Sequence, residues 1–173
     1  GINLIDSSNI EALSNDIKIE RISNVISGIY SSKSNDNKFI DNYITSDISN
    51  RTYLTGIEIR SSDENIIQNN TIDDHYTSIR IYRSKKFNIE DNKIRNETAG
   101  LNIIYSNKMR VINNSFSRCG INLFGRGGYG EPKKYFTTHE IRSNTIDGKP
   151  ILYYENKSDM VIDGDIGELI LIY

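Results

Sequence analysis

The feature that most constrains this sequence is an asparagine that recurs with an apolar residue two positions after it. The successive asparagines lie 18, 28, 22, 22 and 30 residues apart. An apolar residue also stands three positions before each of the last five asparagines. A period of about 22 residues predicts a solenoid, in which each repeat buries its apolar face against the next one. The pairs are Asn24/Ile26, Asn42/Ile44, Asn70/Ile72, Asn92/Ile94, Asn114/Phe116 and Asn144/Ile146.

A second recurring pattern reads small residue, apolar, any residue, apolar, and it begins at Gly56, Ser78, Gly100 and Gly120. Each unit contains three short stretches of period 2 separated by polar corners, and none shows ten residues of helical period. We therefore predict an all-β chain, a single-stranded right-handed parallel β-helix of about seven rungs with three short strands per rung. A leucine-rich repeat is the rival solenoid, but isoleucine rather than leucine fills these columns.

The asparagines are expected at the corner between the second and third strands, because asparagine tolerates left-handed backbone geometry and its amide can bond the amide in the next rung. This predicts an internal asparagine ladder from Asn24 to Asn144. The two longest spacings predict insertions near residues 45–55 and 125–137, and insertions in solenoids often lie on the binding face.

Length and composition predict one β-helix domain over residues 1–173, within a larger protein. Residues 1–18 read as an irregular first rung or partial cap, and 147–173 as terminal rungs. A formal net charge of −2 argues against a nucleic-acid partner, and no apolar run is long enough for a membrane span. The apolar stretch 168–173 suggests end-to-end association with a neighbouring domain or chain.

The repeats GIEIRSSDENIIQNNTI, SIRIYRSKKFNIEDNKI and GLNIIYSNKMRVINNSF resemble the right-handed β-helix repeats of carbohydrate-binding proteins and sugar hydrolases, whose fold is pectate-lyase-like. The resemblance is to the subgroup named after the periplasmic copper-binding protein NosD. The closing segment from NTIDGKP onward is similar to the end of NosD-type domains in archaeal surface proteins. This resemblance implies the fold and a glycan-related role, since the family mixes enzymes, adhesins and surface proteins.

The outward face of the first strand is the candidate ligand-binding surface. A sugar site needs aromatic surface for ring faces and charged or amide groups for hydroxyls and carboxylates. Two outward columns supply both, and the insertion after them adds one arginine. The alternative is an ordinary solvated face with cross-strand pairs such as Glu58 with Arg80. The candidate ligand-binding residues are Glu58, Arg60, Arg80, Tyr82, Phe124 and Arg126.

Asp73, Asp74 and His75 form the densest titratable cluster, at the corner between the third strand and the next rung. Two carboxylates beside an imidazole suit acid–base chemistry or a bound Ca²⁺. Epimerases of this fold place a similar cluster there, but their motif has a proline and a further acid that this stretch lacks. A polysaccharide lyase or epimerase is therefore the catalytic alternative.

Copper is implied only by the family resemblance. Met109 and His139 both stand five residues before a ladder asparagine, so thioether and imidazole would stack in successive rungs, as Cu(I) ligands can. Phe87 belongs to the same column, which favours apolar packing around one histidine. We expect no cofactor.

The function that the sequence favours is a non-catalytic carbohydrate-binding or cell-surface module, located outside the cell or at its surface. A polysaccharide-active enzyme and a purely structural stalk or assembly segment remain as alternatives. The first predicts a polysaccharide or glycan partner, the second turnover of such a polymer, and the third no ligand.

Overall fold

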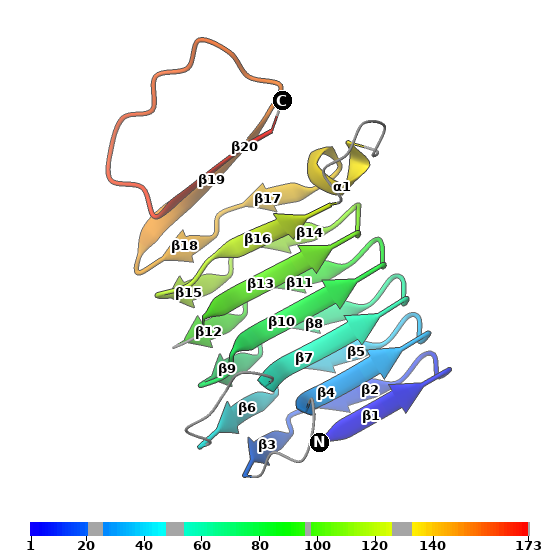
Figure 1. The fold of residues 1–173 in the computed structure, drawn as a ribbon. Helices are drawn as coiled ribbons and strands as arrows, with labels where there is room; N and C mark the ends of the chain where they lie inside the picture. The colour runs from blue at the N-terminus through cyan, green and yellow to red at the C-terminus, as the bar shows by residue number, and fades with distance from the viewer. Residues whose placement is uncertain (21–25, 48–53, 96–97, 126–132, 173) are drawn as a thin grey trace.

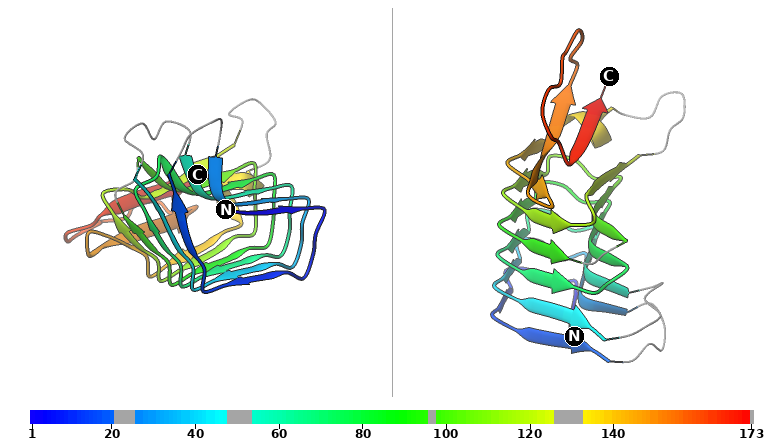
Figure 2. Two further views of the ribbon diagram at one scale, coloured as in Figure 1. Left: turned by 90° about the horizontal axis from the view of Figure 1, so that it is seen from below. Right: turned by 90° about the vertical axis from the view of Figure 1, so that its left-hand side faces the viewer.

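The computed structural model describes residues 1–20, 26–47, 54–95, 98–125 and 133–172, and its chain coils as a right-handed parallel β-helix (Figure 1). Each turn contributes one strand to each of three parallel sheets, so the described residues contain six three-strand rungs. The end-on view in Figure 2 shows the rungs superposed around a common axis. The predicted architecture is confirmed, with six rungs where about seven were expected.

The sheets are named A, B and C in the order in which the chain visits them. Sheet A holds β1 (Ile2–Ile5), β4 (Ile26–Ser32), β7 (Leu54–Arg60), β10 (Thr77–Tyr82), β13 (Ala99–Ile104) and β16 (Ile121–Phe124). Sheet B holds β2 (Glu11–Leu13), β5 (Lys38–Ile40), β8 (Ile66–Gln68), β11 (Asn88–Glu90), β14 (Arg110–Ile112) and β17 (Glu140–Arg142). Sheet C begins with β3 (Asp16–Ile19), β6 (Tyr43–Ser46), β9 (Thr71–Asp73), β12 (Lys93–Arg95), β15 (Ser115–Ser117) and β18 (Thr145–Ile146).

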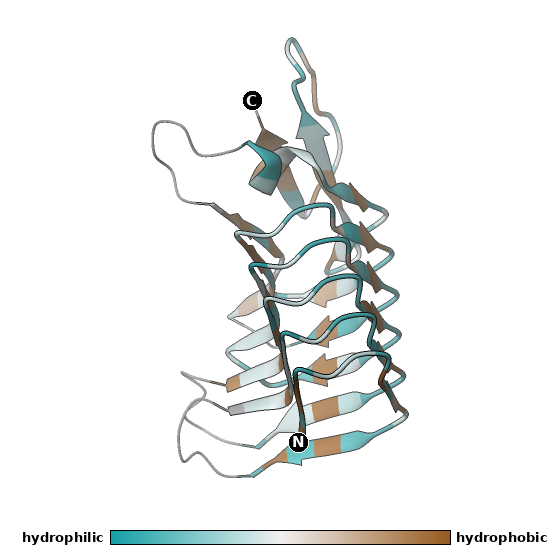
Figure 3. Ribbon diagram, turned by 90° about the vertical axis from the view of Figure 1, so that its right-hand side faces the viewer, coloured by the Kyte–Doolittle hydropathy of each residue, from teal (hydrophilic) through white to brown (hydrophobic). Residues whose placement is uncertain are grey.

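The core is a stack of aliphatic columns that follow the strand register. Ile57, Ile79, Leu101 and Ile121 pair in successive rungs of sheet A, and each is at most 3% exposed. Figure 3 shows the hydrophobic residues recurring at equivalent places in successive strands. β-branched side chains suit such pleated, fully packed surfaces, which explains the isoleucine-rich composition.

The small residue that opens the second sequence pattern is required by close packing between sheets A and C. A Cβ added at Gly56 would lie 2.5 Å from Cγ2 of Ile72 in sheet C, and one added at Gly100 would lie 2.7 Å from Cδ1 of Phe116 in sheet C and 2.6 Å from the carbonyl oxygen of Gly120 in the next rung. These distances are below contact, so a larger side chain there would force the backbone apart.

The asparagine ladder is confirmed from Asn42 to Asn144, and within the described residues it begins one place earlier, at Asn15. The Asn15 backbone and side-chain nitrogens donate to Oδ1 of Asn42 at 3.1 and 2.8 Å. Asn24 lies outside the described residues. Asn15 is 27 residues from Asn42, close to the next interval of 28, because both rungs carry an insertion between sheet C and sheet A.

Left-handed backbone geometry falls on the residue before each ladder asparagine, such as Asp41 with φ 60° and Asp91 with φ 58°. The predicted conformational reason for asparagine is therefore wrong, and its amide hydrogen bonds are the reason. A second ladder runs along the corner between sheets A and B, where the Ser62 amide donates to Oγ of Ser84 at 3.2 Å and the Ser84 amide to Oγ of Ser106 at 3.0 Å.

The predicted insertions near 45–55 and 125–137 include residues 48–53 and 126–132, which lie outside the described residues. The second insertion also contains the short helix α1 (Lys134–Thr137), which packs beside β16 (Figure 1). No helix in the described ranges is long and apolar enough to cross a membrane.

The two ends of the coil are built differently: the first 18 residues belong to a complete rung, whereas the chain after β18 leaves the coil. Residues 1–18 contain β1, β2 and most of β3, which pair in register with the second rung. After β18 the chain reverses at Gly148, whose φ is 80°, and β19 (Lys149–Glu155) pairs antiparallel with β18. β19 then pairs in parallel with β20 (Glu168–Ile172), and the two strands extend beyond the coil (Figure 2). These residues add a two-stranded extension rather than the terminal rungs expected over 147–173.

Candidate functional site

The outer face of sheet A carries the predicted ligand-binding columns, and the strand register brings their members together. Arg80 pairs with Glu58 on one side and Asn102 on the other, and Tyr82 pairs with Arg60 and Ile104. These residues therefore form one continuous surface across β7, β10 and β13. Rungs are spaced by about 4.8 Å, so this surface extends roughly 10 Å along the coil axis.

Glu58 is a buried charge partner within this surface. It is 1% exposed although it lies on the outer side of the sheet. Its Oε1 accepts hydrogen bonds from Nε and Nη2 of Arg60 at 2.8 and 2.5 Å, and its Oε2 accepts one from Oγ of Ser27 at 3.0 Å. The hydrogen bond to Glu58 raises the pKa of Arg60. Glu58 was predicted as a ligand contact, but its carboxylate is occupied by these side chains.

Arg80 is held less tightly than Arg60. Its Nη1 lies 3.7 Å from Oε1 of Glu58, which is an ion pair without a hydrogen bond. Its Nε is buried and has no hydrogen-bond partner within the described part of the chain. The side chain of Arg80 is 29% exposed and that of Arg60 is 44% exposed. Two guanidinium groups thus share one carboxylate, which leaves one positive charge in excess.

Three tyrosines form an aromatic wall at the end of sheet A where its strands finish. The ring centroids of Tyr82 and Tyr105 are 5.9 Å apart at an interplanar angle of 82°, and Tyr105 and Tyr135 repeat this edge-to-face geometry at 5.9 Å and 81°. Edge-to-face contacts fix ring orientation as well as burying apolar area. The wall borders a pocket of about 550 Å³, whose other lining residues are Asp63, Arg83, Ser84, Lys85 and Asn107.

Shared residues connect this pocket to two further hollows on sheet A. Tyr82 also lines a hollow of about 220 Å³ with Arg60, Arg80 and Ile104. Arg60 in turn lines a hollow of about 540 Å³ with residues that include Tyr30. We call the surface formed by these three hollows the sheet A band. It follows the coil axis, a shape that suits an extended ligand.

Two other predicted residues of this surface stand apart from the band. Phe124 pairs with Ile104 in the column of Tyr82 and is 48% exposed, and Arg126 lies outside the described residues. The sequence pattern missed Arg83 and Tyr105, which occupy left-handed corner positions with φ 51° and 49°, just after the alternating strand residues. It also missed Tyr135, which α1 brings from the second insertion.

The corner that precedes β10 holds the predicted catalytic cluster, at the opposite end of that strand from Tyr82. Both carboxylate oxygens of Asp73 accept hydrogen bonds from Arg95, at 2.8 and 2.9 Å. His75 is 1% exposed. Asp73 is therefore engaged in a bidentate ion pair, and the His75 side chain is buried. The Arg95 bonds also occupy the oxygens that a Ca²⁺ ion would need.

The Met109–His139 column does not fit a copper site. The two residues stack in successive rungs as predicted, but Nδ1 of His139 accepts a hydrogen bond from the Met109 amide at 3.3 Å and Nε2 lies 3.0 Å from the carbonyl oxygen of Tyr135. Both ring nitrogens are therefore engaged, and burial lowers the pKa of His139. The described residues contain no group of three or more metal-ligating side chains. In the same column of earlier rungs, Oδ1 of Asn65 accepts from the Asn37 amide at 2.8 Å, so His139 takes the place of an asparagine acceptor.

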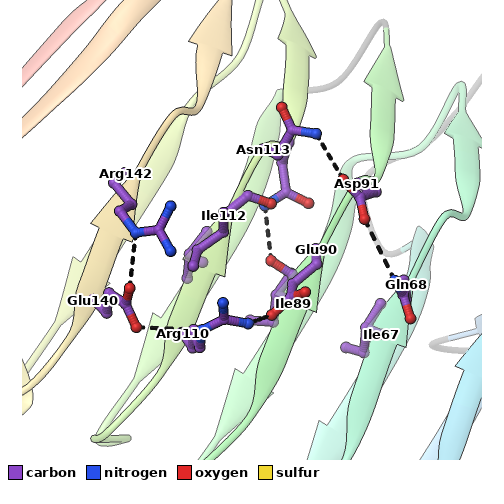
Figure 4. Close-up of polar contacts among 12 residues, drawn as sticks. Ile67, Gln68, Ile89, Glu90, Asp91, Arg110, Ile112, Asn113, Glu140 and Arg142 are labelled. Atoms are coloured by element: carbon purple, nitrogen blue, oxygen red, sulfur yellow. Dashed lines mark hydrogen bonds and ion pairs between the residues drawn. The ribbon is translucent and has the colours of Figure 1, made fainter.

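The outer face of sheet B carries a dense polar network whose charges are already balanced (Figure 4). Arg110 contacts Glu90 and, through Nε, Glu140 at 3.3 Å, and Nε of Arg142 donates to Glu140 at 2.8 Å. Two arginines thus meet two glutamates. This arrangement is typical of cross-strand pairing on a solvated sheet and leaves no excess charge for a ligand.

Parallel strands in three sheets, an aliphatic interior and two internal hydrogen-bonded ladders define the class: this chain is a right-handed parallel β-helix protein. The family model described as "Periplasmic copper-binding protein (NosD)" matches residues 1–157, and the chain belongs to the NosD family.

A solved structure with the same fold is the crystal structure of the periplasmic alginate epimerase AlgG, with a TM-score of 0.57 and 17% sequence identity. The match covers 99% of this chain and 41% of that one. No curated protein matches the chain. The likeness at this identity establishes the fold and carries no activity with it.

Proposed function

We propose that this chain is a non-catalytic glycan-binding β-helix module that acts outside the cytoplasm and holds an extended polysaccharide along the sheet A band. The observation that carries the proposal is the tyrosine wall of Tyr82, Tyr105 and Tyr135 beside the arginine-lined hollow. Aromatic faces contact the apolar faces of sugar rings, and guanidinium and amide groups donate to hydroxyls and carboxylates.

Two comparisons support the class of ligand and the compartment. The family and the structural neighbour are both described as periplasmic, and the neighbour's title names it an alginate epimerase. The engaged Asp73 and the buried His75 favour binding over turnover. A linear polymer is favoured over a compact ligand because the three hollows run in series through Tyr82 and Arg60.

The test is affinity electrophoresis and calorimetry of the chain against a panel of neutral and anionic polysaccharides. Tyr82→Ala and Tyr105→Ala should each weaken binding about tenfold, a change equivalent to the loss of one good aromatic contact. Tyr43→Ala is the matched control, because Tyr43 is 42% exposed but lies on sheet C. Thermal unfolding of each variant would verify that the coil is intact.

Three outcomes distinguish the proposal from its alternatives. Binding that Tyr82→Ala weakens and Tyr43→Ala does not would support it. Polymer cleavage or epimerisation by the wild-type chain, abolished by His75→Ala, would establish the enzyme instead. Absence of binding across the panel, together with concentration-dependent self-association, would favour the structural stalk or assembly segment.

A further inference from the structure

The arginine pair at the centre of the sheet A band has a charge and a hydrogen-bonding capacity that the protein itself does not use. Arg60 and Arg80 carry two positive charges against the single carboxylate of Glu58. On sheet B, by contrast, Arg110 and Arg142 meet two glutamates. The excess charge on sheet A therefore has no counterpart in this network on sheet B.

The two arginines differ in what they leave open. Arg60 is fixed by two hydrogen bonds to Glu58, which uses Nε and one proton of Nη2. Arg80 makes no hydrogen bond to Glu58 at 3.7 Å, and its Nε has no acceptor within the described ranges. A guanidinium group has five N–H donors in a planar fork that matches carboxylate and sulfate oxygens. The Nε of Arg80 is buried, so the donors that remain for a bound anion are those of the Nη groups on its partly exposed side chain.

The surroundings of the pair suit a sugar that carries the anion. Tyr82 and Ile104 complete the hollow of about 220 Å³ around Arg60 and Arg80, so an apolar and aromatic surface adjoins the cationic one. Glu58 is buried beneath the pair and holds Arg60 in place. An anionic group would thus meet a preorganised site, which reduces the entropic cost of binding.

We infer that Arg60, Arg80 and Tyr82 form a subsite for a sugar unit that bears a carboxylate or sulfate group, with Glu58 as the positioning residue. This inference rests on the proposed function and narrows it to acidic glycans. Arg80 provides the donors for the anion, Tyr82 contacts the ring, and Glu58 both orients Arg60 and limits the local charge to one.

The experiment compares matched acidic and neutral polymers by calorimetry with the folded chain. One pair is homogalacturonan oligomers and their fully methyl-esterified form, and the other is dextran sulfate and dextran. The wild-type chain should bind the acidic member of at least one pair about tenfold more tightly, as expected for one charge-assisted contact, and this preference should fall with added salt. The pair that shows the preference identifies carboxylate or sulfate as the anion.

Variants assign the preference to these residues. Arg80→Gln should weaken binding of the acidic polymer more than binding of the neutral one, and so bring the ratio of acidic to neutral affinity close to one. Arg142→Gln, at an arginine on sheet B that is more exposed than Arg80 (55% against 29%), should leave the ratio unchanged. Glu58→Gln should raise the ratio of acidic to neutral affinity and steepen its salt dependence, because the site gains one unit of positive charge. If Glu58 had a purely structural role, the substitution would weaken binding of both polymers equally.

The possible results separate the two proposals. Equal binding of acidic and neutral polymers would overturn the inference and leave glycan binding in place. A preference that persists in Arg80→Gln would overturn the assignment to this subsite. Failure of all four polymers to bind would overturn the inference and count against the proposed function as well.

Discussion

Replacing Asn92 with alanine would remove the centre of the asparagine ladder. Its side-chain nitrogen donates at 2.9 Å to the carbonyls of Ile67 and Glu90 and to Oδ1 of Asn114. Its Oδ1 accepts from the backbone and side-chain nitrogens of Asn70 at 3.0 Å. At about 1 to 3 kcal/mol for each buried group left unpaired, and with two such groups, we expect a loss of about 2 to 6 kcal/mol in the free energy of unfolding.

Asn92→Asp tests the same geometry through pH. The aspartate keeps the oxygen that Asn70 needs but replaces the donor with a second oxygen that faces three acceptors. Burial and these acceptors would raise the pKa of the new carboxyl above its unfolded value of about 3.9. Because the folded state then favours the protonated form, the destabilisation should be largest near neutral pH and should shrink as the pH falls through the raised pKa.

Urea unfolding followed by far-ultraviolet circular dichroism at pH 7 and pH 5 measures both effects. Asn88→Ala is the control, since Asn88 lies in the same rung but is exposed. Comparing each variant with the wild type at the same pH removes the contribution of the other titrating groups. The reasoning would be refuted if Asn92→Ala cost no more than Asn88→Ala, or if the cost of Asn92→Asp were the same at both pH values.

Three further substitutions test the packing and the column interpretation. Ser31→Ala should stabilise the protein by about 1 kcal/mol in urea unfolding, because Ser31 is fully buried and its hydroxyl has no hydrogen-bond partner within the described ranges. Gly100→Ala should destabilise it by about 2 kcal/mol or more in the same assay, since the added methyl meets backbone at 2.6 Å. His139→Asn should reduce the loss of stability as the pH falls from 7.5 to 5. Burial lowers the pKa of His139, so the contribution of this histidine to stability is complete above about pH 6.5 and is lost below it. Asparagine does not titrate and keeps an acceptor for the Met109 amide, as Asn65 does for the Asn37 amide.

The columns could be predicted from the sequence because the period of the pattern equals the number of residues in one rung. Asn15, a ladder residue that the sequence pattern missed, shows the limit of local pattern matching. Asn15 and Asn24 are both followed by isoleucine two positions later, so the motif alone does not separate them. The residue three positions earlier does, since it is Ala12 for the first and Arg21 for the second, and this position faces the core. Because the insertions between rungs differ in length, the spacing between asparagines is a weak guide to which of them belong to the ladder.

The sequence predicts which residues of sheet A point outward, but not which of them remain accessible to a ligand. Alternation places Arg60 and Tyr82 outward, yet it says nothing about whether a neighbour will cover them. Glu58 shows the consequence, because long arginine side chains fold over it and bury a carboxylate on the outer face. Tyr105 and Tyr135 lie at a corner and in an insertion, where no strand period applies. Such residues become visible only when the coil brings them together.

Fold stability and ligand recognition depend on separate residues in this molecule, because the ladder side chains use their hydrogen-bonding groups on one another. The amide of Asn92 is fully bonded within the ladder, whereas the guanidinium of Arg80 retains unused donors. Asn92→Ala should therefore lower the free energy of unfolding, and at temperatures where that variant is folded its preference for acidic polymers should be unchanged. Arg80→Gln should remove the preference for acidic polymers and leave the free energy of unfolding unchanged. Arg80 lies on sheet A and Asn92 at the corner between sheets B and C, and they share no partner, so their effects on stability should add within about 0.5 kcal/mol in the double variant. A larger deviation would show that the sheet A band and the ladder are energetically coupled.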